Sequence, residues 1–412
     1  MSENKKLIPK RRFKEFENTD AWEQHELGDL AEIVRGASPR PIQNPKWFDQ
    51  NSEIGWLRIS DVTEQNGRIH FLEQRISEAG QGKTRVLHSS HLLLSIAATV
   101  GKPVINYVPT GVHDGFLIFL NPKFDLEFMF QWLEMFRPQW QKYGQPGSQV
   151  NLNSDLVKNQ KIFIPSLGEQ KEISSFFTNL DQTIAFQQRK LEKMKSMKSA
   201  YLSEMFPAEG ERKPKRRFPG FTDDWEQREL GKVAKFRRGS FPQPYGLEKW
   251  YGGINEMPFV QVVDVDDNLR LVSDTKQKIS LLAQPKSVFV PQGKVLVTLQ
   301  GSIGRVAINQ YPAYVDRTLL IFESYNIHID EIFWAYIIQK KFDIEKQKAP
   351  GGTIKTITKE VLAKFSVSIP SYDEQQKIGS FFDNLDQTIA FQQKKLEKLK
   401  NIKKAYLNEM FI

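Results

Sequence analysis

The chain has 412 residues and is longer than one ordinary domain, a length that suits two or three. Its hydrophobic content of 40% excludes a disordered composition, and the absence of cysteine excludes disulfides, thiol catalysis and Cys-based zinc sites. The net charge of +9 favours an acidic partner such as nucleic acid, although a soluble protein can also be basic without one.

The beginning of the chain contains only short apolar stretches. A secretory signal needs an apolar core, which the opening M-S-E-N-K-K-L-I-P-K-R-R-F does not provide. No run of 18 apolar residues occurs further along, so we expect no membrane-spanning helix. The expected location is therefore the cytoplasm.

The opening segment recurs in the second half of the chain. P-K-R-R-F begins at Pro9 and again at Pro214, an offset of 205 residues. W-E-Q-H-E-L-G begins at Trp22, and W-E-Q-R-E-L-G begins at Trp225, an offset of 203. Repetition at nearly the same spacing predicts two copies of one structural unit.

Short apolar runs separated by turn residues follow each opening segment. W-L-R-I-S-D-V at Trp56 aligns with F-V-Q-V-V-D-V at Phe259, so the two interiors share a skeleton but differ in their side chains. Strands are expected at Leu92–Ile96, Val295–Leu299, Ile162–Ile164 and Phe365–Ile369, and helices at Phe128–Arg137 and Ile332–Gln339. Each interior is predicted to be a mixed α/β domain whose strand order the sequence leaves open.

A long segment with a heptad pattern closes each half. Phe176–Phe206 and Phe381–Phe411 are identical at 24 of 31 positions, and their apolar residues alternate in steps of four and three. The seam predicted for the first copy consists of Ile173, Phe177, Leu180, Ile184, Gln187, Leu191 and Met194. The seam predicted for the second copy consists of Ile378, Phe382, Leu385, Ile389, Gln392, Leu396 and Leu399.

Each of these helices would be about 60 Å long and could not fold in isolation. The simplest partner of each copy is the other, in an antiparallel coiled coil; the alternative is an ordinary amphipathic helix packed on its own domain. With aligned ends, Gln187 and Gln392 would meet near the two midpoints and hydrogen-bond across the seam. Such a pair would penalise a slipped register.

The predicted fold class is therefore α/β (mixed α+β), with two similar domains separated by two long helices. The predicted boundaries are 1–165 for the first domain, 166–207 for the central helix, 208–370 for the second domain and 371–412 for the C-terminal helix.

These features resemble the specificity subunits of type I restriction-modification enzymes. The resemblance covers nearly the whole chain and rests on the repeated R-R-F-x-x-F and W-E-Q-x-E-L-G openings and on the I-P-S, E-Q-x-x-I and F-F-x-x-L-D-Q helices. It implies two target-recognition domains that each read half of a split DNA target, and helices that set the spacer and dock two methyltransferase subunits. It also implies restriction subunits that act as ATP-dependent translocase and nuclease. S-adenosylmethionine, ATP and Mg²⁺ would belong to those partners, and no membrane is involved.

The chain contains only fragments of enzyme motifs. G-Q-G-K-T at Gly80–Thr84 has Ser77 where a phosphate-binding loop needs glycine. N-P-K-W at Asn44 and N-P-K-F at Asn121 lack the second proline of the N-P-P-Y signature of amino-methyltransferases. We therefore assign no catalytic and no metal-binding residue and predict a non-catalytic subunit. An enzyme with degenerate motifs and a coiled-coil scaffold that binds only protein are the alternatives.

Polar residues that differ between the two interiors are the candidates for DNA contact, because Arg, Lys, Asn and Gln read bases and basic residues fix phosphates. In the first domain these are Arg35, Arg40, Arg58, Lys83, Arg85, Lys102, Gln149 and Asn151. In the second they are Arg237, Arg238, Gln261, Lys276, Lys278, Gln300, Arg305, Thr353 and Lys355.

Overall fold

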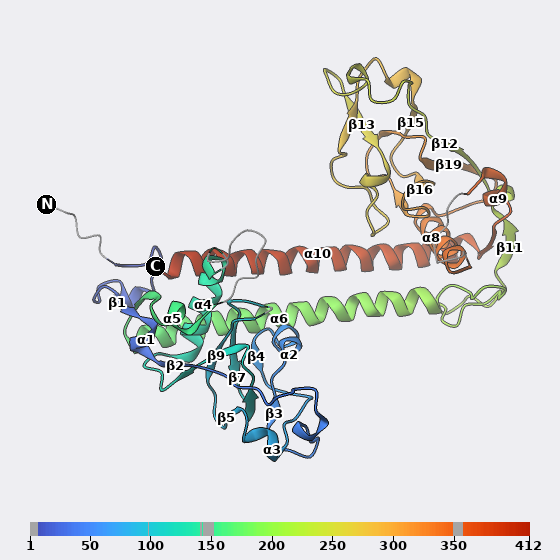
Figure 1. The fold of residues 1–412 in the computed structure, drawn as a ribbon. Coiled ribbons are helices and arrows are strands. Elements are labelled where there is room, and N and C mark those ends of the chain that lie inside the picture. The colour runs from blue at the N-terminus through green and yellow to red at the C-terminus, as the bar shows by residue number, and fades with distance from the viewer. Residues whose placement is uncertain (1–6, 98, 141, 143–151, 349–356) are drawn as a thin grey trace. The chain divides into compact units, whose positions relative to one another are not determined.

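The computed structural model describes residues 7–97, 99–140, 142, 152–348 and 357–412. Contacts within the chain divide it into two compact units, one of residues 1–188 with 394–412 and one of residues 189–393. The two long helices are α6 (Leu167–Glu204) and α10 (Tyr372–Met410). Each unit therefore contains one domain together with part of each long helix (Figure 1).

The domain of the first unit is built on a five-stranded sheet of order β2-β9-β6-β7-β4 and a three-stranded sheet of order β3-β8-β5. The strands are β2 (Glu32–Arg35), β3 (Gly55–Trp56), β4 (Arg68–Ile69), β5 (Arg85–Leu87), β6 (Leu92–Ser95), β7 (Pro103–Asn106), β8 (Thr110–Val112) and β9 (Phe116–Leu120). Its helices are α1 (Leu27–Leu30), α2 (Ile59–Glu64), α3 (Glu78–Gln81), α4 (Leu126–Trp140) and α5 (Ser154–Lys158).

The domain of the second unit repeats this plan with two four-stranded sheets of orders β12-β19-β16-β17 and β14-β13-β18-β15. The strands are β12 (Ala234–Arg238), β13 (Met257–Val260), β14 (Gln277–Ile279), β15 (Val288–Val290), β16 (Val295–Thr298), β17 (Val306–Ile308), β18 (Ala313–Val315) and β19 (Leu319–Tyr325). Its helices are α7 (Leu230–Val233), α8 (Glu331–Lys348) and α9 (Lys359–Ala363).

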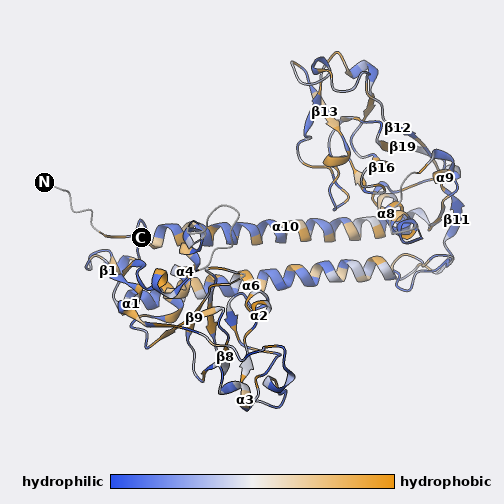
Figure 2. Ribbon diagram, viewed as in Figure 1, coloured by the Kyte–Doolittle hydropathy of each residue, from blue (hydrophilic) through white to orange (hydrophobic). Residues whose placement is uncertain are grey.

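The expected strands and helices of the interiors are present. The runs at Leu92 and Val295 form the fully buried strands β6 and β16, and the aromatic segments form α4 and α8. Figure 2 shows apolar residues gathered in the strands of both domains, whereas the long helices alternate between apolar and polar residues along their length. Burial of the apolar strands drives this folding, because removal of apolar surface from water is the main favourable term.

The segments that bracket each domain pair with each other. β1 (Glu23–Glu26) runs antiparallel to β10 (Lys161–Ile164), and β11 (Glu226–Glu229) runs antiparallel to β20 (Ser366–Ile369). The repeated W-E-Q motif therefore lies beside the strand that leads into each long helix. This pairing explains why both ends of the repeat are matched while the interior varies.

The repeated R-R motif joins the start of one long helix to the end of the other. In the first unit, Arg12 makes a bidentate ion pair with Glu169 near the start of α6, with both N–O distances 2.7 Å. Arg11 pairs with Glu409 near the end of α10 at 2.7 Å. We call this pair of interactions the arginine clamp of the first unit.

The second unit has the same arginine clamp. Arg217 pairs with Glu374 at the start of α10, again with both distances 2.7 Å, and Arg216 pairs with Glu204 at the end of α6 at 2.6 Å. The inner ion pair is buried in both units, since the side chains of Glu169 and Glu374 are 1% and 0% exposed. Buried charges need partners, so each clamp fixes where the motif lies on the helices.

The helix seam contains an ion pair in each unit as well as apolar contacts. Lys403 of α10 pairs with Asp181 of α6 at 2.6 Å, and Lys198 of α6 pairs with Asp386 of α10 at 2.5 Å. Within each unit the two helix segments are therefore antiparallel. All the predicted seam positions are buried or half-buried.

The expected hydrogen bond between the two seam glutamines is absent from the structure. In the described part of the chain, the buried Oε1 atoms of Gln187 and Gln392 accept no hydrogen bond. In an antiparallel pair, six residues forward on one helix correspond to six residues back on the other. Counted from Asp181–Lys403, Gln187 is therefore level with residue 397. Counted from Asp386–Lys198, Gln392 is level with residue 192. The prediction was wrong because the lysine–aspartate pairs, and not the glutamines, set the register within each unit.

Candidate nucleic-acid interface

Three loops meet in the first domain: the loop after β2, the start of α2, and the turn between β8 and β9. Asp114 in that turn holds the first loop in place. Its carboxylate accepts from the Ser38 hydroxyl at 2.7 Å and from Arg40 at 3.0 Å, while its backbone carbonyl accepts from Arg35 at 2.6 Å. The Ser38 hydrogen bond, and to a smaller extent the two arginines, lower the pKa of Asp114. Asp114 therefore positions Arg40 through its charged carboxylate and Arg35 through its backbone carbonyl.

A glycine allows the loop after β2 to lie directly on this turn. A Cβ atom at Gly36 would be 2.1 Å from the carbonyl oxygen of His113. The equivalent Gly239 in the second domain has the same restriction, because its Cβ would be 2.1 Å from the carbonyl oxygen of Val315. Any side chain at these positions would separate the loop from the turn.

Arg58 occupies the N-cap of α2 on the other side of the site. The carboxylate of Asp61 accepts from the backbone N–H of Arg58 at 2.8 Å and from its guanidinium at 2.8 Å. The hydrogen bond that Arg58 donates to Asp61 raises the pKa of Arg58, and the arginine side chain remains 36% exposed. Arg58 is thus a permanently charged group in a fixed position that a ligand can still reach.

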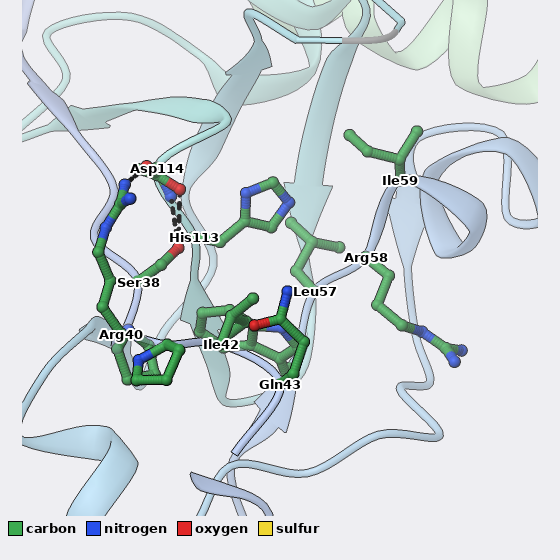
Figure 3. Close-up of a pocket in the computed structure, with 12 residues that line it drawn as sticks. Ser38, Arg40, Ile42, Gln43, Leu57, Arg58, Ile59, His113 and Asp114 are labelled. Carbon is green, nitrogen blue, oxygen red and sulfur yellow. Dashed lines mark hydrogen bonds and ion pairs between the residues drawn. The ribbon is translucent and has the colours of Figure 1, made fainter. Parts of the chain in front are cut away.

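A hollow of about 650 Å³ lies between these loops (Figure 3). Its apolar walls include Ile42, Trp56 and Leu57, and Arg40 and Arg58 line it as well. The imidazole of His113 lies between Asp114 and Leu57 in Figure 3. The site therefore combines positive charge with an apolar interior.

Two further predicted residues lie close to this site. Arg85 on β5 donates to the backbone carbonyl of Arg35 at 2.8 Å. Lys83 is exposed in the turn before β5, next to Thr84, whose hydroxyl donates to the carbonyl of Ala37 at 2.6 Å. The structure thus brings together five of the predicted residues, namely Arg35, Arg40, Arg58, Lys83 and Arg85.

The remaining predicted residues of the first domain are not part of this group. Lys102 forms an ion pair with Glu134 on α4, and its side chain is only 14% exposed. Gln149 and Asn151 lie outside the described residues.

The second domain builds its corresponding site from different side chains. Gln261 caps a short 3-10 helix, Val262–Asp264, just as Arg58 caps α2. Its amide donates to the hydroxyl of Tyr245 at 2.6 Å, and that hydroxyl donates to Asp316 at 3.0 Å. Burial and the nearby Asp316 raise the pKa of Tyr245, which is therefore a neutral phenol at neutral pH.

The other predicted residues of the second domain are more scattered. Arg238 lines a separate hollow of about 330 Å³ that also contains Lys359. The rest are placed as follows: Lys276 and Gln300 are exposed, Arg237 is 3.8 Å from Glu323, Lys278 pairs with Asp274, Arg305 pairs with Asp267 at 3.0 Å, and Thr353 and Lys355 lie outside the described residues.

Our reading of the sequence missed His113, Asp114, Tyr245 and Asp316. No motif marks these residues, and three of them carry no positive charge at any pH. A signal was nevertheless present, because His113 and Asp316 are aligned at the 203-residue offset of the interiors and differ in chemistry on a common skeleton.

The motif fragments form no enzyme site in the described residues. G-Q-G-K-T runs from the last residues of α3 to the residue before β5, so a helix precedes the turn and a strand follows it. A phosphate-binding loop has the opposite order, strand before helix. The described parts of the chain contain no group of three His, Asp or Glu residues that could hold a metal ion. None of the described helices is long and apolar enough to cross a membrane.

Comparison with known proteins identifies two copies of one domain. Residues 19–196 and 222–401 each match the family described as "Type I restriction modification DNA specificity domain". A protein of Methanocaldococcus jannaschii, described as a type I restriction enzyme MjaX specificity subunit, is 23% identical over 94% of this chain and 92% of its own length.

Solved structures share the fold. The S subunit of a type I restriction-modification system from M. genitalium aligns with a TM-score of 0.62, at 13% identity and over 98% of this chain and 99% of its own. A chain from a structure concerned with the assembly and conformational transition of the type I R-M system aligns with a TM-score of 0.54. It is 19% identical over 94% of this chain and 97% of its own.

Proposed function

This chain belongs to the type I restriction modification DNA specificity family, and we propose that each of its two domains reads one half of a split DNA target. It is the specificity subunit of a type I restriction-modification system and contains two target-recognition domains. The observation that carries the proposal is the pair of corresponding sites. The same loops hold Arg40, Arg58 and His113 in one domain but Tyr245 and Gln261 in the other.

The chemistry of these sites supports base reading. Arginine suits guanine, and glutamine suits adenine, because the donors and acceptors of each side chain match those of that base in the major groove. Two sites with different side chains would read different sequences. The exposed Lys83 and Lys276 would hold the phosphates on either side.

The helices would set the spacer and bind the partner subunits. The two copies expose the same aromatic side chain on their outer faces, since Phe186 and Phe391 are equivalent and are 57% and 65% exposed. An exposed large aromatic residue in a repeated setting suits a docking site that occurs twice. This repetition supports two methyltransferase subunits of one kind, joined by restriction subunits for cleavage.

We propose that the chain itself is non-catalytic. S-adenosylmethionine, ATP and Mg²⁺ would be bound by the methyltransferase and restriction subunits. The complex would act in the cytoplasm, where its DNA substrate lies.

Methyl transfer to DNA tests this proposal. The purified chain should transfer no methyl group, and the chain together with its methyltransferase partner should methylate a split target. Comparison of adenine methylation in the host genome with and without the chain then identifies that target. Methyl incorporation by the chain alone, or methylation by the partner without it at the same sites, would contradict the proposal.

A further inference from the structure

The hollow of the first domain contains a histidine that is held in one orientation. The imidazole of His113 packs against the rings of Trp56 and Phe116, with centroid distances of 5.9 and 4.9 Å. The Nδ1 atom of His113 accepts a hydrogen bond from the backbone N–H of Gly115 at 2.9 Å. A Cβ atom at Gly115 would be 2.4 Å from the imidazole, so only glycine allows the ring to fold back in this way.

This hydrogen bond determines which nitrogen carries the proton. Because Nδ1 is an acceptor, the proton of the neutral imidazole is on Nε2. Among the described residues, Nε2 of His113 has no hydrogen-bond partner, and it is not a buried unpaired atom. Desolvation lowers the pKa of His113, so the neutral form predominates at neutral pH. The ring therefore presents a single fixed N–H donor.

The surroundings of this donor suit a DNA base. Ile42 and Leu57 form apolar walls, while Arg40 and Arg58 line the same hollow and can neutralise phosphates at its edge. The Arg40 side chain is 81% exposed and can reach outward. The positive charge around the hollow favours an electron-rich ligand, and its apolar walls suit a planar one. The single oriented donor favours a ligand that has a hydrogen-bond acceptor.

We propose that the hollow of the first domain receives the major-groove edge of one base of the DNA target and that Nε2–H of His113 donates to an acceptor on that base. The acceptors in the major groove are N7 and O6 of guanine, N7 of adenine and O4 of thymine. Cytosine presents an amino donor there instead. His113 thus disfavours cytosine at one position of the first half-site.

The second domain differs at this position. Its aligned residue is Asp316, whose carboxylate accepts from Tyr245 and from the hydroxyl of Thr318 at 2.6 Å. Tyr245 and Asp316 replace the fixed donor with a hydrogen-bonded pair. The discrimination against cytosine by a histidine donor therefore belongs to the first half-site only.

This inference rests on the proposed function, and the test separates the two. Chain and methyltransferase partner are combined, and methylation rates are measured on duplexes in which each base pair of the first half-site is changed in turn. With the wild-type chain, cytosine at one position should reduce the rate about 2- to 10-fold through loss of one neutral hydrogen bond. In His113→Phe this penalty should disappear, whereas in His113→Gln, whose amide retains a donor, it should remain.

Two control variants accompany these measurements. His70→Phe makes the same chemical change at an exposed histidine outside the hollow and should leave every preference unchanged. Tyr245→Phe alters the corresponding site of the second domain and should change only the second half-site. Circular dichroism of each variant shows whether it is folded, and the wild-type chain with cytosine-substituted duplexes tests the inference without any variant.

The outcomes are distinct. If the wild-type complex methylates no split target, the proposed function fails. If it does, but no first half-site position disfavours cytosine, or if the penalty survives in a folded His113→Phe variant, the role of His113 is overturned. A change of both half-sites in His113→Phe would likewise overturn it, because the effect would then be structural.

Discussion

The two domains keep their attachments to the helices and change their reading loops. Arg12–Glu169 and Arg217–Glu374 have the same bidentate geometry in the two units. The loops that face the candidate sites differ in their polar side chains: the first domain has His113 where the second has Asp316, which accepts a hydrogen bond from Tyr245. The repeat therefore keeps the attachment of each domain to the long helices constant, whereas the side chains proposed to read DNA vary.

The largest effect should come from exchange of a whole reading region. Replacing residues 37–160 with the equivalent region of a relative should change one half of the target completely and leave the other half unchanged. The reason is that the exchanged segment contains all three loops around Asp114 and none of the second site. Methylation mapping of the host genome measures this, and a change in both half-sites would show that the domains do not read independently.

The spacer between the half-sites should respond to helix length. Gln188 and Gln393 are equivalent and each ends its part of a unit, so an insertion after Gln188 replaces no residue of the clamps or of the seam ion pairs. Four inserted residues lengthen α6 by about 6 Å and turn the following part by about 40°. Since DNA advances about 3.4 Å per base pair, the preferred spacer should grow by one or two base pairs.

A matched double insertion sharpens this measurement. Insertion after both Gln188 and Gln393 lengthens the two helices equally and restores their antiparallel pairing. We expect the same longer spacer with a stability closer to that of the wild-type chain. A methylation map with the original spacer after either change would show that the helices do not set the distance.

The arginine clamps should be equally important to the two units. Arg12→Ala and Arg217→Ala each leave a glutamate buried without its partner, which costs about 3–5 kcal/mol of unfolding free energy. Arg11→Ala and Arg216→Ala remove solvent-exposed ion pairs and should lower the unfolding free energy much less. Urea unfolding measures the cost, and amide hydrogen exchange shows which unit loosens. Equal costs for inner and outer arginines would contradict the distinction between them.

The smallest effect is a pH dependence confined to the first unit. In the folded state the pKa of His113 lies below its ordinary value of 6.5. The unfolded chain therefore binds a proton at this residue more tightly than the folded chain does. Stability from this group is fully present above pH 6.5 and is lost progressively as the pH falls from 6.5 through the lower pKa of the folded state. Nearby Asp114 opposes the shift, and Arg40 and Arg58 are positive throughout this range.

Hydrogen exchange of the two units at pH 7.5 and pH 5.5 measures this effect. The first unit of the wild-type chain should lose more protection on acidification than that of His113→Phe. The second unit should respond alike in both proteins, since it has Asp316 at the aligned position. Identical pH dependence of the first unit in the two proteins would remove His113 as the cause.

The sequence predicted the parts of the molecule that depend on periodic or repeated patterns. Heptad spacing located α6 and α10, and buried apolar runs located β6 and β16. The contacts that fix geometry depend on residues distant in the chain: Arg12 and Glu169 are 157 residues apart, and no local pattern joins them. The error over Gln187 and Gln392 has the same origin, because a seam shows which residues face inward but not which of them meet.

The order in which the chain is made has a consequence for the first domain. Its core contains Trp22, Phe128 and Phe177, and also Met410 and Phe411 from the far end of the sequence. The second unit is continuous and can be completed once residue 393 has left the ribosome. The first domain is translated earlier, but Met410 and Phe411 complete its core only after the entire second unit has been synthesised. It is therefore the unit that is most exposed to chaperones and proteases during synthesis, and a stalled ribosome would release it incomplete.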